Sequence, residues 1–284
     1  MKKYIIMTDS SCDLPASYIA EKDVRVVPLS VTVGEKSFLQ YPDYREMSHE
    51  EFYTALQNGA TGATAGTNIQ DAVKYMTEAI QEGNDIIYLS LSSGLSCSYQ
   101  NACLAAEEVL EEYPDAKIAV VDTLLVATGI GMLVVKAIQY KEQGIDFNTA
   151  LENIYDNCKN MRLQFCVEEL SALSRSGRIS HMTASVGSML GIKPLLHIDE
   201  QGKIQSVGKA RGRKTAIKQL TNDMIMSARD RTTFILGHVG AQEDAEAIKA
   251  QVLEAYPDST VIVTEIGPVV AIHTGMKTMA FTNL

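Results

Sequence analysis

Short apolar runs alternate with amphipathic stretches of helical length through the first half of the chain. The runs with the length of buried strands are Tyr4–Met7, Val24–Val33, Asp85–Leu91 and Lys117–Asp122. The stretches with helical periodicity or capping signals start at Asp13, Ser48, Asp71 and Leu95, and the last three end at Gln57, Glu82 and Tyr113. Repeated strand, loop and helix units are typical of parallel sheets with crossover helices, so the pattern predicts an α/β fold.

The pattern changes near residue 158, where a helical stretch at Tyr140–Cys158 ends. The strands predicted beyond it are Met161–Val167, Pro194–Ile198, Lys203–Val207, Thr233–Gly237 and Thr260–Thr264. A hairpin turn is expected at Asp199–Gly202 and a helix at Ser180–Leu190. We therefore predict two α/β domains, 1–158 and 159–284, with largely parallel or mixed sheets and a ligand between them.

The balance of charges narrows the class of partner. The chain has 284 residues, a net charge of -10 and 46% hydrophobic residues, enough for a substantial core. Nucleic acid and anionic membranes attract positive surfaces, so neither is an expected partner. No apolar run reaches the roughly 18 residues of a membrane span, and the apolar run at the N-terminus is too short for a secretion signal. The chain is therefore predicted to be cytoplasmic.

Hydroxyl-rich loops follow several predicted strands. They are Thr8–Ser11, Thr64–Asn68, Ser90–Ser96 and Asp122–Thr123, of which the second lies in a predicted loop of small residues at Gly62–Asn68. The carboxyl ends of parallel strands meet at one edge of a sheet, so these loops are expected to converge on one polar group. Ser92–Ser96 also precedes a helix, whose N-terminal N–H groups and dipole favour an anion such as a carboxylate, without a metal. The alternative is that the serines only cap the helix.

An enzymatic alternative rests on the same loop. Gly94–Ser98 lies at a strand-to-helix turn and differs by one residue from the Gly-x-Ser-x-Gly nucleophile elbow. A serine hydrolase or acyl transferase would use Ser96 or Ser93 as nucleophile and needs a base. His273, in a glycine-bounded segment at 267–275, is the candidate base, although a structural histidine is an equal alternative.

Other motif searches argue against nucleotide and metal chemistry. The sequence has no Walker loop, no His-Glu-x-x-His and no acidic metal loop, and Gly129–Gly131 lacks the rest of a dinucleotide fingerprint. No cofactor or metal site is therefore predicted.

Basic residues gather in one stretch of this acidic chain: Arg175, Arg178, Lys203, Lys209, Arg211, Arg213, Lys214 and Lys218. They indicate either a docking site for an anionic partner or a solvated charged face.

The order of motifs resembles the bacterial DegV family over essentially the whole chain. The matching segments are Thr8–Pro15, Ser92–Ser96 with Tyr99-Gln100, Val120–Thr123, Ser176–Ser180, Ile192–Pro194, Lys209–Lys214, and Gly267-Pro268 with His273–Gly275. The resemblance implies a two-domain α/β protein that binds a long-chain fatty acid in a buried tunnel. It implies carboxylate contacts at Thr64, Ser93 and His273, with Asp9, Ser10, Ser92 and Ser96 as further pocket residues.

The resemblance also implies a use for the bound lipid. Some family members present the fatty acid to a separate ATP-dependent fatty acid kinase, which makes an acyl phosphate for phospholipid synthesis. Arg178, Arg211 and Arg213 are then candidates for docking the kinase. A non-catalytic carrier of this kind is the expected function, with the bound fatty acid as ligand and no cofactor. A lipid-sensing regulatory protein would share the same pocket.

Overall fold

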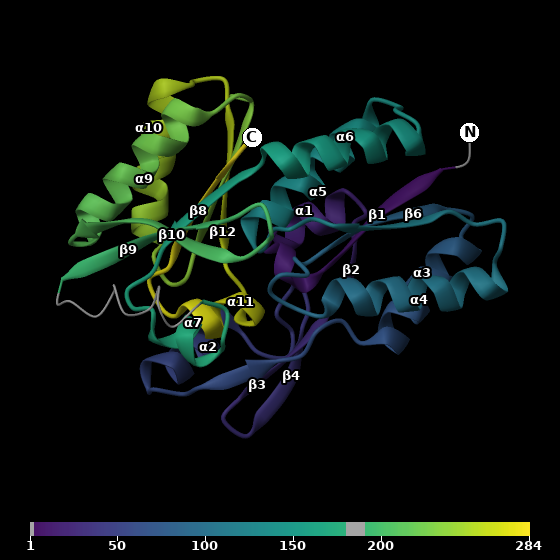
Figure 1. The fold of residues 1–284 in the computed structure, drawn as a ribbon, viewed down its shortest axis with the longest axis horizontal. Coiled ribbons are helices and arrows are strands. Elements are labelled where there is room, and N and C mark those ends of the chain that lie inside the picture. The colour runs from purple at the N-terminus through teal and green to yellow at the C-terminus, as the bar shows by residue number, and fades with distance from the viewer. Residues whose placement is uncertain (1–2, 180–190) are drawn as a thin grey trace.

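The computed structural model describes residues 3–179 and 191–284 as a mixed α/β fold. The described residues form three sheets, which Figure 1 shows with their covering helices. The predicted fold class, with parallel and mixed sheets, is confirmed. The helix expected at Ser180–Leu190 lies outside the described residues.

The first sheet is built from the strands that the apolar runs predicted. Its order is β2 (Arg25–Val27), β1 (Tyr4–Asp9), β6 (Asp85–Ser90) and β7 (Ile118–Asp122), and all three pairings are parallel. Alternate side chains of β1 point to opposite faces. Ile5 and Met7 pack with helices α3 (Ile69–Gln81) and α4 (Ser98–Glu112). Tyr4 and Ile6 join the cluster that contains α5 (Thr128–Glu142) and α6 (Phe147–Asn160).

The second sheet is mixed and comes from the other half of the chain. Its order is β10 (Ile204–Arg211), β9 (Ile192–Ile198), β8 (Arg162–Cys166), β13 (Met279–Asn283), β11 (Thr233–His238) and β12 (Thr260–Glu265). β11 and β12 run parallel, and the other neighbours run antiparallel. Helices α9 (Arg213–Ser227) and α10 (Gln242–Ala255) pack on one face. On the other side, α5 contacts strands of both sheets, so residues 128–138 of this helix are all buried.

A small antiparallel sheet completes the fold. It consists of β4 (Lys36–Gln40), β3 (Leu29–Val33) and β5 (Gly62–Thr64). Helix α2 (His49–Gln57) follows β4 and starts with the expected capping box of Ser48 and Glu51. In Figure 1, α2, α7 (Ser171–Arg175) and α11 (Pro268–Thr274) lie together near this sheet. Two short elements, η1 (Ser10–Cys12) and α1 (Ala16–Glu21), follow β1.

Several predicted boundaries were wrong for identifiable reasons. The loop expected at Gly62–Asn68 begins as β5, which backbone pairing with β3 holds although its side chains are mostly exposed. The single helix expected at Tyr140–Cys158 is the end of α5 followed by α6, because Gly144 adopts a φ of 74° between them. Thr260–Thr264 is the last strand that the sequence predicts, but helix α11 and strand β13 follow β12. The domain boundary at 158 falls inside α6 and stays a prediction.

Two buried polar side chains fix the start of α11. The Gly267 N–H donates to Asp13 Oδ1 over 2.9 Å, and the Val269 N–H donates to Gln40 Oε1 over 2.7 Å. Gln40 Nε2 donates in turn to the Ser10 carbonyl, also over 2.7 Å. These bonds satisfy amide groups at the helix N-terminus that have no partner within the helix. They also connect α11 to the small sheet and to the loop after β1.

We expect Gln40→Leu to destabilise the protein while keeping a similar side-chain volume. The substitution leaves the Val269 N–H and the Ser10 carbonyl buried without these partners, and each such group costs roughly 1–3 kcal/mol. The free energy of unfolding in urea should therefore fall by about 2–6 kcal/mol. Gln251→Leu, at an exposed position of α10, is the control and should change it by less than about 0.5 kcal/mol. Equal effects of the two substitutions would contradict the anchoring role of Gln40.

Candidate functional site: a cavity between the sheets

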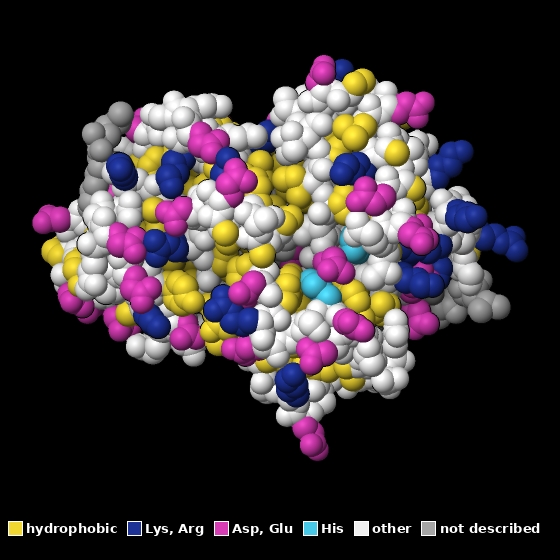
Figure 2. Space-filling view, turned by 180° about the vertical axis from the view of Figure 1, so that it is seen from behind, with side chains coloured by type: hydrophobic (Ala, Val, Ile, Leu, Met, Phe, Trp, Pro, Cys, Tyr) yellow, Lys and Arg dark blue, Asp and Glu magenta, His cyan; other side chains and the backbone are white. Residues whose placement is uncertain are grey.

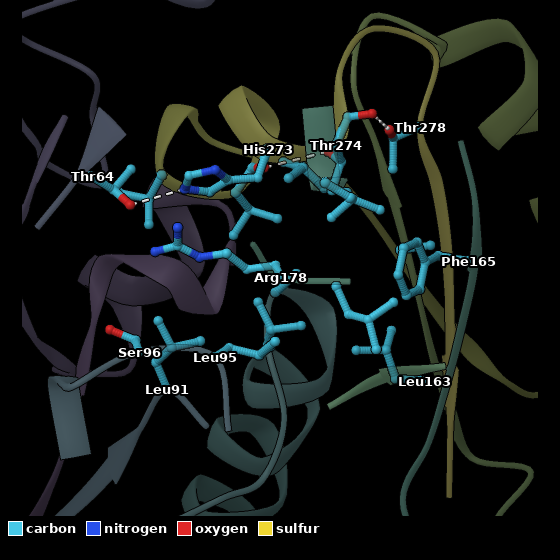
Figure 3. A pocket seen from close by; sticks show the side chains of 18 of the residues that line it. Thr64, Leu91, Leu95, Ser96, Leu163, Phe165, Arg178, His273, Thr274 and Thr278 are labelled. Carbon is cyan, nitrogen blue, oxygen red and sulfur yellow. Dashed lines mark hydrogen bonds between the residues drawn. The ribbon is translucent and has the colours of Figure 1, made fainter. Parts of the chain in front are cut away.

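A mainly apolar cavity lies where the carboxyl ends of β6 and β7 face the mixed sheet. Apolar side chains from the segments after β6 and β7, from the mixed sheet and from α11 form most of its wall, among them Leu91, Val126, Leu163, Phe165 and Val270. Its polar lining residues are Thr64, Ser96, Arg178, His273, Thr274 and Thr278. Figure 3 shows Thr64, Ser96, Arg178 and His273 toward one end, and Leu163 and Phe165 toward the other. The cavity is therefore amphipathic along its length.

Thr64 and His273, two of the predicted carboxylate contacts, meet at the polar end, although 209 residues separate them in the sequence. Thr64 Oγ1 and His273 Nε2 lie 2.9 Å apart and share a hydrogen bond. β5 places the threonine, and α11 places the imidazole. Burial, followed by the nearby positive charge of Arg178, lowers the pKa of His273 to about 4. The imidazole is consequently neutral at pH 7 and can donate or accept one hydrogen bond at each ring nitrogen.

Arg178 is the cation of this polar end. Gly177, with a φ of 71°, turns the chain after α7. The guanidinium lies between the Thr64–His273 pair and Ser96 (Figure 3), and Nη1 donates to the Ser176 carbonyl. Among the described residues, no carboxylate forms an ion pair with Arg178. The docking role that the resemblance implies for this arginine stays a prediction, and its side chain lines the cavity.

The loop after β6 brings Ser96, rather than Ser93, to the cavity. The Ser93 N–H donates to Asp122 Oδ1 over 3.1 Å, and Ser93 is not among the described residues that line the cavity. Ser92 Oγ donates to the Gly202 carbonyl over 2.8 Å and accepts from the Gly94 N–H. Ser96 Oγ lies 2.9 Å from Ser98 Oγ. The two earlier serines thus shape the loop, and Ser96 supplies a hydroxyl to the polar end.

Asp9 and Ser10 support the cavity from behind its wall. Asp9 accepts the N–H groups of Ser11 and Leu91 over 3.0 Å each, and Ser10 Oγ accepts the Leu29 N–H over 3.0 Å. Burial raises the pKa of Asp9, although these hydrogen bonds oppose the shift. Leu29 and Leu91 line the cavity, whereas Asp9 and Ser10 are not part of its described lining. Both polar residues therefore position apolar wall residues.

Of the two remaining predicted docking residues, Arg213 is ion-paired within the protein and Arg211 is exposed. Arg213 is engaged within the protein: it pairs with Glu168 over 3.0 Å and with Asp244 over 2.7 Å, and it donates to the Lys277 carbonyl. Arg211, at the end of β10, is exposed. On the face shown in Figure 2, acidic side chains lie among the basic ones. Arg211 thus remains available as a docking residue, and Arg213 holds α9 to α10 and to the residues after β8.

The described residues give no sign of a membrane span or a metal site. Within residues 3–179 and 191–284, every helix is too short or too polar to cross a membrane. The same ranges contain no group of three or more His, Cys, Asp or Glu side chains arranged to hold a metal ion.

The structure is thus that of an α/β protein with a mainly apolar cavity between its sheets. The chain belongs to the DegV family, because the family model described as "Uncharacterised protein, DegV family" matches residues 3–283. A DegV domain-containing protein of Clostridium perfringens is 35% identical over 283 residues, which are 99% of this chain and 97% of that protein. One from Lactococcus lactis is 35% identical over 98% of this chain and 96% of its own length.

Solved structures of the same fold include proteins named for fatty acid binding. A DegV family protein from Thermus thermophilus, named for its fatty acid binding, has a TM-score of 0.88 at 29% identity, over 99% of both chains. A Thermotoga maritima protein described as revealing a fatty acid binding function has a TM-score of 0.85 at 26% identity, over 99% of both chains. The Streptococcus pneumoniae fatty acid kinase B3 protein, loaded with linoleic acid, has a TM-score of 0.86 over 99% of both chains. At 19% identity, this last likeness concerns the fold alone.

The lowered pKa of His273 predicts a loss of stability in acid. The folded pKa is about 4, and the ordinary value is 6.5. Between these values the unfolded state binds more protons, so the free energy of unfolding falls as the pH decreases from 6.5 toward 4. His273→Gln keeps a hydrogen-bonding group without a titration. The wild type should lose more stability than this variant between pH 7 and pH 4.5, by about 2–3 kcal/mol at most. Urea unfolding at both pH values measures the difference, and parallel losses would contradict the assignment.

Proposed function

We propose that this protein binds a long-chain fatty acid, with the carboxylate at the polar end of the cavity and the acyl tail along the apolar wall. The observation that carries the proposal is Arg178, whose guanidinium lines a mainly apolar cavity without a carboxylate partner among the described residues. A cation in apolar surroundings is costly unless it is paired. An amphipathic anion would supply the pairing charge and cover the apolar wall. The names of the Thermus and Thermotoga structures support the same ligand class.

The polar groups have complementary roles toward a carboxylate. Arg178 provides charge and several donors, and the Ser96 hydroxyl can provide one more. Thr64 and the neutral His273 share a hydrogen bond, so the pair has one proton left to donate, either from the Thr64 hydroxyl or from His273 Nδ1. The proposed set differs from the predicted Thr64, Ser93 and His273 in one residue, because Ser96 lines the cavity and Ser93 is not among its described lining residues. A bound carboxylate would also favour protonation of His273, because an opposite charge raises the pKa of an imidazole.

The tail supplies most of the binding free energy. Each buried methylene contributes roughly 0.8 kcal/mol, so a dozen methylenes contribute about 10 kcal/mol before association costs are subtracted. A hydrogen bond to a charged group contributes roughly 1.5–3 kcal/mol. The apolar wall therefore gives affinity, and the polar end determines which end of the ligand faces outward.

The use that we propose for the bound lipid concerns its carboxylate. We propose that the protein presents it to an ATP-dependent fatty acid kinase in the cytoplasm. A carboxylate oxygen would attack the γ-phosphorus of ATP, forming an O–P bond while the β–γ bridging P–O bond breaks and ADP leaves. The product is an acyl phosphate for lipid synthesis. The Streptococcus pneumoniae kinase B3 protein has this fold, and exposed Arg211 is the docking candidate that the structure leaves unpaired among the described residues.

The geometry favours a carrier over a serine hydrolase. His273 Nε2 bonds Thr64, and Ser96 Oγ bonds Ser98 Oγ. Within residues 3–179 and 191–284, no hydrogen bond joins His273 to Ser93 or Ser96, as a nucleophile and its base would require. A lipid-sensing regulator would use the same cavity and would differ from a carrier only in its partner.

We expect native mass spectrometry of the freshly purified protein to show one fatty acid per chain. Arg178→Gln removes the charge-assisted bonds, so its dissociation constant for hexadecanoate should rise about 10- to 100-fold. Arg211→Gln removes the same charge from an exposed position and is the matched control. A wild-type protein that carries no fatty acid and refuses added hexadecanoate would overturn the proposed function. Equal effects of the two substitutions would overturn the role of Arg178.

A second substitution pair separates the two serines. Ser96→Ala removes a hydroxyl at the polar end and should weaken hexadecanoate binding about tenfold. Ser93→Ala removes a side chain from the same loop, but its backbone bond to Asp122 remains, so binding should change less than about twofold. Isothermal titration of both variants decides the matter. A larger loss for Ser93→Ala would restore the assignment drawn from the sequence.

A further inference from the structure

A second depression lies directly outside the polar end, on the other side of His273. We call it the outer groove. It lies between the end of α2 with the residues leading into β5, the α7 segment, and the end of α11. His273 and Thr274 line both the outer groove and the cavity. A group bonded to the carboxyl of a bound fatty acid could therefore extend past the imidazole into this groove.

Two arginines of one segment stand on either side of this shared wall. Arg178 lines the cavity, and Arg175, three residues earlier at the end of α7, lines the outer groove. Arg175 is exposed and forms no ion pair with a described residue. Gln57, Thr61 and Ser176 add polar side chains to the same lining. The arrangement offers one cation to the carboxyl and a second to an anionic group beyond it.

The acidic residues that line the outer groove, Glu168 and Glu169, form no ion pair with Arg175. Glu168 pairs with Lys193 and with Arg213, so its charge is balanced by residues outside the groove lining. Glu169 accepts a hydrogen bond from Ser171 Oγ over 3.3 Å. Among the described residues of the lining, Glu169 is the carboxylate that would oppose a bound anion.

A groove on the other side of the polar end has the opposite character. It shares Thr64 and Ala65 with the cavity and continues over Cys97, Asn101 and the start of α3. Its charged lining residues within the described chain are Asp71 and Glu108, and no Lys or Arg is among them. An anionic group would be repelled there, so the outer groove is the favourable direction.

We infer that the outer groove is a subsite for the phosphate of an acyl phosphate, with Arg175 as its cation. The inference rests on the proposed function, because the acyl chain must first occupy the cavity. Arg178 and the hydroxyls would remain at the acyl carbonyl, and the phosphate would lie beyond His273 beside Arg175. An arginine can bond two phosphate oxygens at once, which suits this position.

The probe for this subsite is the β-ketophosphonate analogue of palmitoyl phosphate, in which a methylene group replaces the bridging oxygen and prevents hydrolysis. Hexadecanoate is the comparison ligand, because it carries the same chain without the phosphate. We expect Arg175→Gln to weaken the phosphonate about tenfold, which corresponds to about 1.4 kcal/mol, and to change hexadecanoate affinity less than about twofold. Glu169→Gln removes the opposing charge and should tighten the phosphonate severalfold. Arg211→Gln is the control for net charge.

The outcomes of isothermal titration separate the two proposals. A selective loss of phosphonate affinity in Arg175→Gln, with a gain in Glu169→Gln, supports the subsite. Equal changes for both ligands, or the same change in Arg211→Gln, would overturn it while leaving fatty acid binding intact. A wild-type protein that binds neither ligand would overturn the proposed function itself.

Discussion

The bonds of Asp13 and Gln40 to the start of α11 determine the geometry of the site. α11 carries His273 at one end and two apolar lining residues, Val269 and Val270, near the other. It has only seven residues, too few to be stable by propensity alone. Its place is therefore set by buried contacts, above all by an amide and a carboxyl group that belong to the other half of the chain. Burial raises the pKa of Asp13 well above its ordinary value, although its bond to the Gly267 N–H opposes the shift.

The polar end combines a neutral imidazole, His273, with a charged guanidinium, Arg178. Burial keeps His273 neutral at pH 7, whereas the Arg178 guanidinium is a cation. Among the described lining residues, Arg178 is thus the cation in a mainly apolar cavity, an arrangement that a bound anion would stabilise. A ligand that binds only the folded state also stabilises it, so the same electrostatic imbalance links occupancy of the cavity to the stability of the fold.

The sequence predicted the elements whose patterns are local. Buried strands such as β1 and β6 are continuous apolar runs, and α2 carries its own capping box, so these were identified. β5 has little apolar character and exists through pairing with β3, a tertiary contact that no window of sequence contains. β13 was missed because it enters the mixed sheet between β8 and β11, strands that come much earlier in the chain.

At the site, Thr64 and His273 were singled out from the sequence and lie together. The direction of Arg178, inward rather than outward, depends on the turn at Gly177, and the choice between Ser93 and Ser96 depends on how Asp122 and Gly202 hold the loop.

The position of α5 has a consequence for how the chain behaves as a whole. This helix packs against both large sheets, and one hydrophobic cluster includes Ile6 of β1, Ile130 of α5 and Ile235 of β11. The two halves therefore share one hydrophobic cluster, in addition to a cluster that belongs to each half alone. Cutting the chain near residue 158 would leave a broad apolar face on each fragment, so neither half is expected to be a self-sufficient folding unit. Loss of structure should accordingly spread through both halves in one cooperative transition.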